Sequence, residues 1–311
     1  MKKLFAVLWM ILLVSETMAQ TPETYSGPII DMHLHAHTSE SFGGPAPNPA
    51  TGEISVENAS EHSRKSVDLL HENNIVLAVV DGKSPEAVDS WEEKFEHEIV
   101  RGLKVFDPRN LDLDQFEKWV EEGKVELFGE IGTIYAGYTP ADSLLLPYYE
   151  ICEKYDVPVA IHAGGSFPGI TERNKDFRLR LGDPFLVEDI LVEYPKLRVY
   201  LMHAGAHFYE RTAMLMRQYP NLYVDIAVLN WVPDAQNFFH PFLKLAKEYQ
   251  VLDRVMYGSD QMIWPEAIDL AIQNLQSVDF LTFEHKKDIF YDNAARFLQL
   301  SEAEIESHHK N

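Results

Sequence analysis

Cysteine is almost absent from this chain, which has one cysteine, Cys152, in 311 residues. A single thiol cannot form an intramolecular disulfide, so a small scaffold held together by disulfides is excluded. Cys152 lies in an apolar helical run, where we expect it to be buried. A hydrophobic core must therefore stabilise the fold, and a chain of this length suits one large domain or two small ones.

Positive charge is also scarce, because 27 Lys and Arg residues stand against 49 Asp and Glu residues, for a formal net charge of −22. Such an acidic surface repels nucleic acid and anionic membranes at long range, and no basic patch compensates for it. We therefore expect a small-molecule substrate and no nucleic-acid partner. The oligomeric state stays open, and the sequence is compatible with a homo-oligomer.

Long hydrophobic runs are missing except at the N-terminus, where two lysines precede an apolar run over 4–14 and the small-residue segment Thr17-Met18-Ala19. This run is too short to span a bilayer comfortably, so the pattern predicts a secretory signal peptide over 1–19 that is cleaved after Ala19. An uncleaved membrane anchor is the alternative. We expect a periplasmic or secreted protein with no stable membrane insertion after cleavage.

From residue 20 onward, apolar runs alternate with longer amphipathic stretches, which indicates strands alternating with helices. The predicted strands are 29–35, 75–80, 100–106, 125–131, 157–162, 197–203, 222–227 and 254–257. The predicted helices are 58–72, 85–97, 113–122, 140–155, 184–193, 211–219, 241–250, 265–276 and 283–298. Eight such units predict an α/β fold, a (β/α)8 TIM barrel over 20–300, followed by a polar, frayed tail over 301–311. A doubly wound open sheet is the rival, but it requires a Gly-rich phosphate turn where this chain has histidines.

Metal-ligand residue types gather at the predicted carboxyl ends of the strands, where barrel enzymes carry their function. They are His33, His35, Glu130, His162, His203 and Asp260. His33 and His35 share one face of a strand, so their imidazoles can bind one divalent metal from the same side. We expect Asp31 to lie beneath them and to fix an imidazole tautomer as a hydrogen-bond acceptor.

Five short segments around these residues resemble the amidohydrolase superfamily, in particular its amidohydrolase-2 branch of metal-dependent hydrolases and decarboxylases. They are Asp31-Met32-His33-Leu34-His35, Gly129-Glu130-Ile131-Gly132, Ile161-His162-Ala163, Met202-His203-Ala204-Gly205 and Tyr257-Gly258-Ser259-Asp260. The segment 290–297 also resembles the last helix of that branch. The resemblance covers about 28–298 and depends on the order and spacing of the motifs together.

The resemblance implies that His33, His35, His162 and Asp260 bind a catalytic divalent metal, usually zinc. It makes His203 either a ligand of a second metal or a residue that orients water. Two-metal members of the superfamily carry a bridging glutamate or carboxylated lysine at the position of Glu130. Glu130 therefore favours two metal ions without settling their number.

A metal-dependent hydrolase that cleaves a small ester, lactone or amide is the activity implied by the resemblance. A divalent ion lowers the pKa of bound water to about 7, so hydroxide becomes available at neutral pH. Asp260 would accept the proton, and His203 would help to polarise the attacked group. The alternatives are non-oxidative decarboxylation of a small unsaturated or aromatic acid, and a TatD-like phosphodiesterase, which Glu130 favours and the acidity opposes. A binding protein that lost its chemistry is disfavoured, because no ligand is missing.

Three arginines, Arg173, Arg178 and Arg180, crowd the predicted loop 164–182 after the fifth strand. We expect this loop to overhang the metal, where a guanidinium could hold a substrate carboxylate or phosphate in a bidentate grip. A solvated loop is the alternative for each of them. Which substrate binds depends on the conformation of such loops.

Overall fold

The computed structural model of the chain describes residues 24–310. The predicted signal peptide over 1–19 lies outside these residues. Among the residues described, no helix combines the length and the apolar character needed to cross a bilayer.

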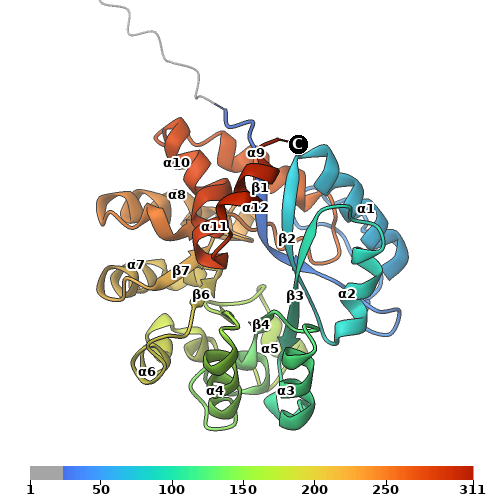
Figure 1. The fold of residues 1–311 in the computed structure, drawn as a ribbon, viewed down its shortest axis with the longest axis vertical. Coiled ribbons are helices and arrows are strands. Elements are labelled where there is room, and N and C mark those ends of the chain that lie inside the picture. Colours follow the sequence, from blue (N-terminus) through green and yellow to red (C-terminus); the bar gives the residue numbers. More distant parts are fainter. Residues whose placement is uncertain (1–23, 311) are drawn as a thin grey trace, which may run out of the picture.

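Eight parallel strands form one sheet in chain order, which confirms the predicted (β/α)8 barrel (Figure 1). The strands are β1 (Ile29–His35), β2 (Ile75–Gly82), β3 (Glu98–Val105), β4 (Leu127–Ile131), β5 (Val159–His162), β6 (Val199–Met202), β7 (Leu222–Asp225) and β8 (Val255–Met256). Two backbone hydrogen bonds connect the last strand to the first: Met32 N donates to Tyr257 O at 3.0 Å, and Asp260 N donates to His33 O at 2.8 Å. Hydrogen bonds therefore connect β1 to the segment that contains and follows β8, which closes the barrel. The alternative prediction of an open sheet is wrong.

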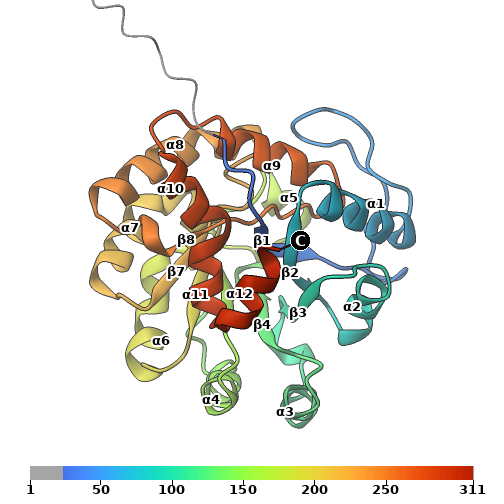
Figure 2. The ribbon, with the colours of Figure 1, turned by 45° about the horizontal axis from the view of Figure 1, so that its top comes forward.

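Helices surround the strands (Figure 2). They are α1 (Ala59–Glu72), α2 (Pro85–Glu92), α3 (Leu113–Glu121), α4 (Leu146–Tyr155), α5 (Ile170–Arg173), α6 (Glu188–Glu193), α7 (Tyr209–Gln218), α8 (Pro233–Glu248), α9 (Ala267–Gln276), α10 (Phe283–Lys287), α11 (Asn293–Leu298) and α12 (Glu302–His308). Because the helices cover the outer face of the sheet and side chains fill the inside, every residue of β1 and β2 is buried. Burial on both faces explains why these strands are nearly continuous apolar runs in the sequence.

The C-terminal helices pack against the amino ends of the strands. Tyr291 and Phe297 belong to the same buried cluster as Met32 of β1. Arg198, directly before β6, donates from Nη1 to Phe297 O at 2.9 Å. The amino end of the barrel is therefore covered by protein, which leaves the carboxyl end of the strands for a site.

The predicted frayed tail over 301–311 is wrong, because α12 occupies most of it. Ser301 and Glu304 form a capping box at the start of α12, in which each side chain accepts from the other residue's backbone N–H. The Tyr291 hydroxyl lies 2.8 Å from His308 Nδ1, and both residues are buried. This tertiary contact holds a polar segment that shows no apolar periodicity in the sequence.

Helix boundaries were the weakest part of the prediction. The predicted helix over 241–250 begins too late, because α8 begins at Pro233 and carries Pro241 inside it. Pro241 cannot donate to the carbonyl of Asn237, but Asn237 is exposed, so water can satisfy that carbonyl. Phe239 and Phe242, on either side of the proline, are buried, and their packing maintains the helix. The predicted helix 283–298 is also interrupted by a π-helical turn, Asp288–Asp292.

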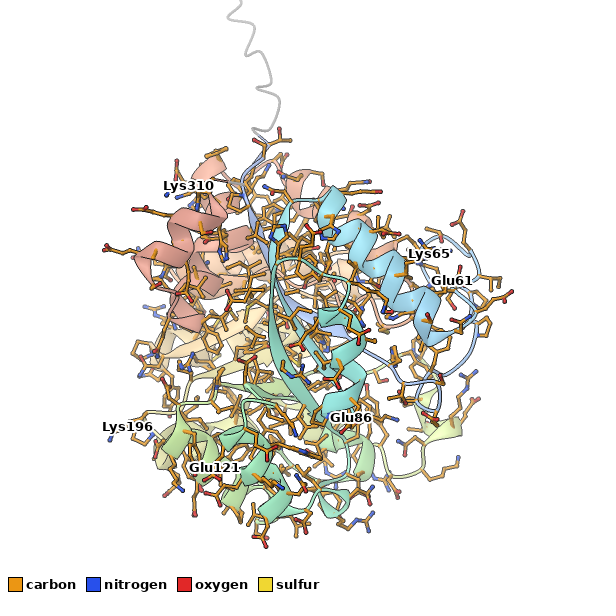
Figure 3. The ribbon with its side chains drawn as sticks, turned by 45° about the vertical axis from the view of Figure 1, so that its right-hand side comes forward. Glu61, Lys65, Glu86, Glu121, Lys196 and Lys310 are labelled. Carbon is orange, nitrogen blue, oxygen red and sulfur yellow. The ribbon has the colours of Figure 1, made fainter. Side chains whose placement is uncertain are left out.

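Charged side chains occupy the outer surface of the helical layer, where Figure 3 labels several of them. Glu61 and Lys65 on α1 form an ion pair at 3.0 Å, one helical turn apart. Exposed pairs of this kind contribute about 0.3–0.5 kcal/mol each. The stability of the domain therefore depends on its buried layers.

Candidate metal centre

The six predicted strand-end residues converge in the structure. They come from β1, β4 and β5 and from the segments directly after β6 and β8. Ligand-type atoms of His33, His35 and Glu130 lie within 4.8 Å of one another, and the same holds for Glu130, His162 and His203. Asp260 joins them, with Oδ1 3.0 Å from His35 Nε2. Residues separated by more than 200 positions in the sequence thus form one cluster.

Two carboxylates outside the predicted set fix the histidines of β1. His33 Nδ1 lies 3.0 Å from Asp225 Oδ2, and His35 Nδ1 lies 2.6 Å from Asp81 Oδ1. Asp225 and Asp81 are acceptors, so we assign the proton of each imidazole to Nδ1. The Nε2 lone pair of each ring therefore faces the cluster.

His162 and His203 are fixed in the same way by backbone carbonyls. His162 Nε2 lies 3.0 Å from Gly165 O, and His203 Nδ1 lies 3.3 Å from Ala227 O. A carbonyl can only accept, so we assign a proton to each of these nitrogens. The opposite nitrogens, His162 Nδ1 and His203 Nε2, lie 3.2 Å apart and both face the Glu130 carboxylate.

Four imidazole lone pairs and two carboxylates therefore point at one small volume. His162 Nδ1 lies only 2.6 Å from Glu130 Oε1, a distance at which two lone pairs repel each other unless one atom carries a proton or both bind the same cation. His33 Nε2 and Asp260 Oδ1 are buried without any hydrogen-bond partner. Nitrogen and oxygen donors of this kind are ligands for zinc and other divalent metals. The residues present thus fit the metal centre implied by the sequence.

The pKa values reflect how strongly this cluster attracts positive charge. Burial by itself would lower the pKa of His33, but the charges of Asp260 and Asp225 raise it to about 10. Burial would raise the pKa of Asp260, but His33 and His35 hold it well below its usual range. The pKa of Glu130 is likewise low despite its burial, because His162 and His203, when each also carries a proton on the nitrogen facing it, donate to its carboxylate. Asp260 and Glu130 are therefore ionised at neutral pH.

The supporting carboxylate of Asp225 is more deeply buried than three of the predicted ligands. Glu130, His162 and His203 keep 5–6% of their surface exposed, whereas Asp225 keeps none. The carboxylate of Asp225 is therefore inaccessible to solvent. This arrangement is typical of a centre whose ligands are oriented by hydrogen bonds from behind.

Two cluster residues adopt a backbone conformation that non-glycine residues rarely occupy. His203 has φ +59° and Asp260 has φ +47°, both in the left-handed region. Such conformations cost free energy and occur at functional sites when the surrounding structure enforces them. The Asp260 N–H bond to His33 O is one such constraint, because it ties the residue to β1.

Asp81, the next-to-last residue of β2, and Asp225, the last residue of β7, were not among the predicted site residues. The predicted tautomer-fixing role of Asp31 is wrong. Asp31 Oδ1 instead accepts the backbone N–H groups of His33 and Ser259, each at 3.0 Å. Asp31 therefore joins the backbones of β1 and the segment after β8, while Asp225 and Asp81 orient the rings.

The three loop arginines are exposed side chains in the structure. Arg173 lies over the Phe167 ring, with its guanidinium carbon 5.7 Å from the ring centre. Arg178 donates to the backbone carbonyls of Lys175 and Phe177, which fixes its guanidinium to its own loop. None of the ion pairs found among residues 24–310 involves Arg173, Arg178 or Arg180. Their role in substrate binding stays a prediction.

Comparison with known proteins supports the same family. A family model described as amidohydrolase matches residues 30–300, while no curated protein sequence matches the chain. An uncharacterized TIM-barrel protein from Bordetella bronchiseptica is 17% identical, covers 88% of this chain and 98% of its own, and superposes with a TM-score of 0.63. A probable 2-pyrone-4,6-dicarboxylic acid hydrolase from Acinetobacter baumannii, with citric acid bound, is 12% identical over 88% of this chain and 99% of its own, with a TM-score of 0.59. A 5-carboxyvanillate decarboxylase from Novosphingobium aromaticivorans, with bound manganese, is 15% identical over 88% of this chain and 97% of its own, with a TM-score of 0.59. At these identities the solved structures support the fold alone.

Proposed function

Because this chain belongs to the amidohydrolase family, we propose that it is a metal-dependent hydrolase of a small ester, lactone or amide. The observation that supports this most strongly is the convergence of four imidazole lone pairs with the carboxylates of Glu130 and Asp260. The residues that would hold the metal are His33, His35, Glu130, His162, His203 and Asp260. We propose zinc as the ion, with manganese, which a structural neighbour binds, as the ion to test beside it.

A divalent cation in such a centre supplies Lewis acidity, which acidifies water and polarises a carbonyl oxygen. The chain supplies the proton transfers. Asp260 is ionised, and its Oδ1 has no hydrogen-bond partner, so it is in the form that accepts a proton from the attacking water and passes it to the leaving group. His203, whose Nε2 faces the cluster, is placed to orient the attacked group.

The test combines metal analysis with a substrate panel. Protein purified without chelator is assayed for bound metal and for turnover of esters, lactones, amides, phosphoesters and carboxylic acids. We expect hydrolysis of at least one ester, lactone or amide, which chelator abolishes and metal restores. Release of CO2 from a carboxylic acid with no hydrolysis would replace the proposal by decarboxylation, and turnover confined to phosphoesters would replace it by phosphodiesterase activity.

Asp260→Asn tests the proton acceptor within the same panel. We expect a loss of turnover of about 10²–10⁴-fold while bound metal is retained, because general acid–base catalysis contributes on that scale. Asp279→Asn, the same change at an exposed position, serves as the matched control and should be unaffected. Unchanged turnover in Asp260→Asn would refute the role.

We also propose that the enzyme is exported and acts in the periplasm or outside the cell. The basic start, the apolar run over 4–14 and the small residues before position 20 support this. N-terminal sequencing of the protein from the extracytoplasmic fraction should begin at Gln20. Protein found only in the cytoplasm, with an intact N-terminus, would contradict the proposal.

A further inference from the structure

One ammonium group lies among the carboxylates at the carboxyl end of the barrel. Lys104 is the next-to-last residue of β3, and its side chain is only 8% exposed. Its Nζ lies 3.3 Å from Asp81 Oδ1, the same oxygen that accepts from His35 Nδ1. The ammonium is therefore two contacts away from a histidine of the metal centre.

The protein uses only part of the hydrogen-bonding capacity of this ammonium. A lysine has three N–H donors and no acceptor. Within residues 24–310, the polar partner of Nζ is Asp81 alone, and the remaining neighbour of note is the Phe106 ring, whose centre lies 5.8 Å away. Two donors are thus free for a ligand that reaches the centre.

Neutralising Asp81 does not require this lysine. Asp81 Oδ1 already accepts from His35, and Asp81 Oδ2 accepts from the backbone N–H of Glu130 at 3.0 Å. A carboxylate with these bonds is satisfied without a further cation. Lys104 is also the sole lysine or arginine found in ion-pair contact with this carboxylate cluster among the residues described. The hydrogen bonds of Asp81 therefore do not depend on Lys104, and the two unused donors of the ammonium are available for a ligand.

We propose that Lys104 is a specificity-determining residue that binds a carboxylate of the substrate. The inference rests on the proposed function, since it places the reacting bond at the metal centre. It adds that the substrate carries a free carboxylate a few atoms from that bond. A single ammonium matches one negative charge, whereas a doubly charged phosphate would meet the repulsion of Asp81, Glu130 and Asp260.

Calorimetric binding of a charged probe and its neutral counterpart tests this without any turnover. Glutarate and glutaramide are titrated into the metal-loaded protein and into chelator-treated protein. We expect Lys104→Met to weaken glutarate binding about tenfold or more, as loss of a charge-assisted hydrogen bond does, and to leave glutaramide binding unchanged. Lys83→Met is the matched control, because it removes the same charge from an exposed position just after β2.

Two other outcomes would overturn the inference, and a third would refute only the proposed function. Unchanged glutarate binding in Lys104→Met, or equal weakening of both probes, would show that Lys104 is structural. Inorganic phosphate that requires Lys104 when glutarate does not would replace the carboxylate by a phosphate. Should Lys104→Met fail to fold, as judged by its thermal unfolding, Lys104→Gln retains a donor to Asp81 and provides the same comparison. A wild-type protein that hydrolyses nothing in the panel but needs Lys104 for glutarate would refute the proposed function alone.

Discussion

Replacing Asp225 with asparagine should weaken metal binding while leaving the fold intact. Asp225 Oδ1 accepts two backbone N–H groups, from His203 at 2.7 Å and from Ala227 at 3.0 Å, and Oδ2 accepts from His33 Nδ1. An asparagine can keep the two backbone bonds only if its carbonyl oxygen replaces Oδ1. Its NH2 group then faces His33 Nδ1 with a hydrogen atom instead of a lone pair.

Two donors cannot bond to each other, so His33 must change its tautomer. Its proton moves to Nε2, and the nitrogen that faced the centre no longer offers a lone pair. The reverse orientation of the amide would leave two buried backbone donors unpaired, at a cost of about 1–3 kcal/mol each, so it is disfavoured. Loss of a partner that orients a ligand typically costs about 10–100-fold in metal affinity, or roughly 1.4–2.7 kcal/mol.

Competition with a chromophoric chelator measures this affinity, and circular dichroism checks the fold. Asp31→Asn is the matched control, because Asp31 is equally buried and bonds to backbone N–H groups, but to no imidazole. We expect the control to bind metal within about threefold of the wild type, below the effect of a lost orienting partner. Equal affinity in Asp225→Asn and the wild type would refute the assignment of the His33 tautomer.

Three further predictions concern the same region. A saturating divalent metal should raise the melting temperature of chelator-treated protein, because a ligand at 100 times its Kd stabilises the folded state by about 2.7 kcal/mol; an unchanged melting temperature would contradict a metal centre. Gly258→Ala should destabilise the fold by about 1–3 kcal/mol in urea unfolding, because the new Cβ would lie 2.9 Å from His33 Cβ, whereas Gly43→Ala, with nothing within 4 Å, should have little effect. Burial raises the pKa of Asp31 to about 7, so the folded state holds a proton that the unfolded chain loses near pH 4, and stability falls as the pH rises between these values. Asp31→Asn lacks this penalty. The melting temperature of the variant minus that of the wild type should therefore increase as the pH rises from 5 to 8. A difference in melting temperature that does not change with pH would contradict the raised pKa.

The strand-end histidines could be read from the sequence because local rules determine them. The alternation of side chains along β1 puts His33 and His35 on one face, and the barrel topology brings the carboxyl ends of all strands together. The structure confirms that convergence, including the contact of Asp260 with His35. Helix ends were less predictable, because packing maintains α8 through Pro241 against its local preference.

The orienting residues could not be read, because their partners depend on register between strands. Asp81 pairs with His35 across β1 and β2 and with Gly102 across β2 and β3, which places it beside His35 and close to Lys104. The sequence assigned the tautomer-fixing role to the nearest carboxylate, Asp31, but His33 bonds to Asp225, which lies 192 residues away. Side-chain type alone does not distinguish such a carboxylate from any other.

The charge of the centre links its metal to its folding. Four buried carboxylates, Asp81, Glu130, Asp225 and Asp260, surround the histidines, and among the residues described Lys104 is the one ammonium in contact with any of them, so neutral imidazoles leave three negative charges in a largely buried region. Buried charge without compensation is expensive, and protonation of His33 and His35, whose pKa values are both raised, is the relief that the chain itself can offer. One divalent ion would reduce the excess to one negative charge, and two would reverse it to one positive charge. A bound substrate carboxylate would cancel that remaining charge only in the second case, so carboxylate recognition by Lys104 would be favoured by a centre that holds two ions.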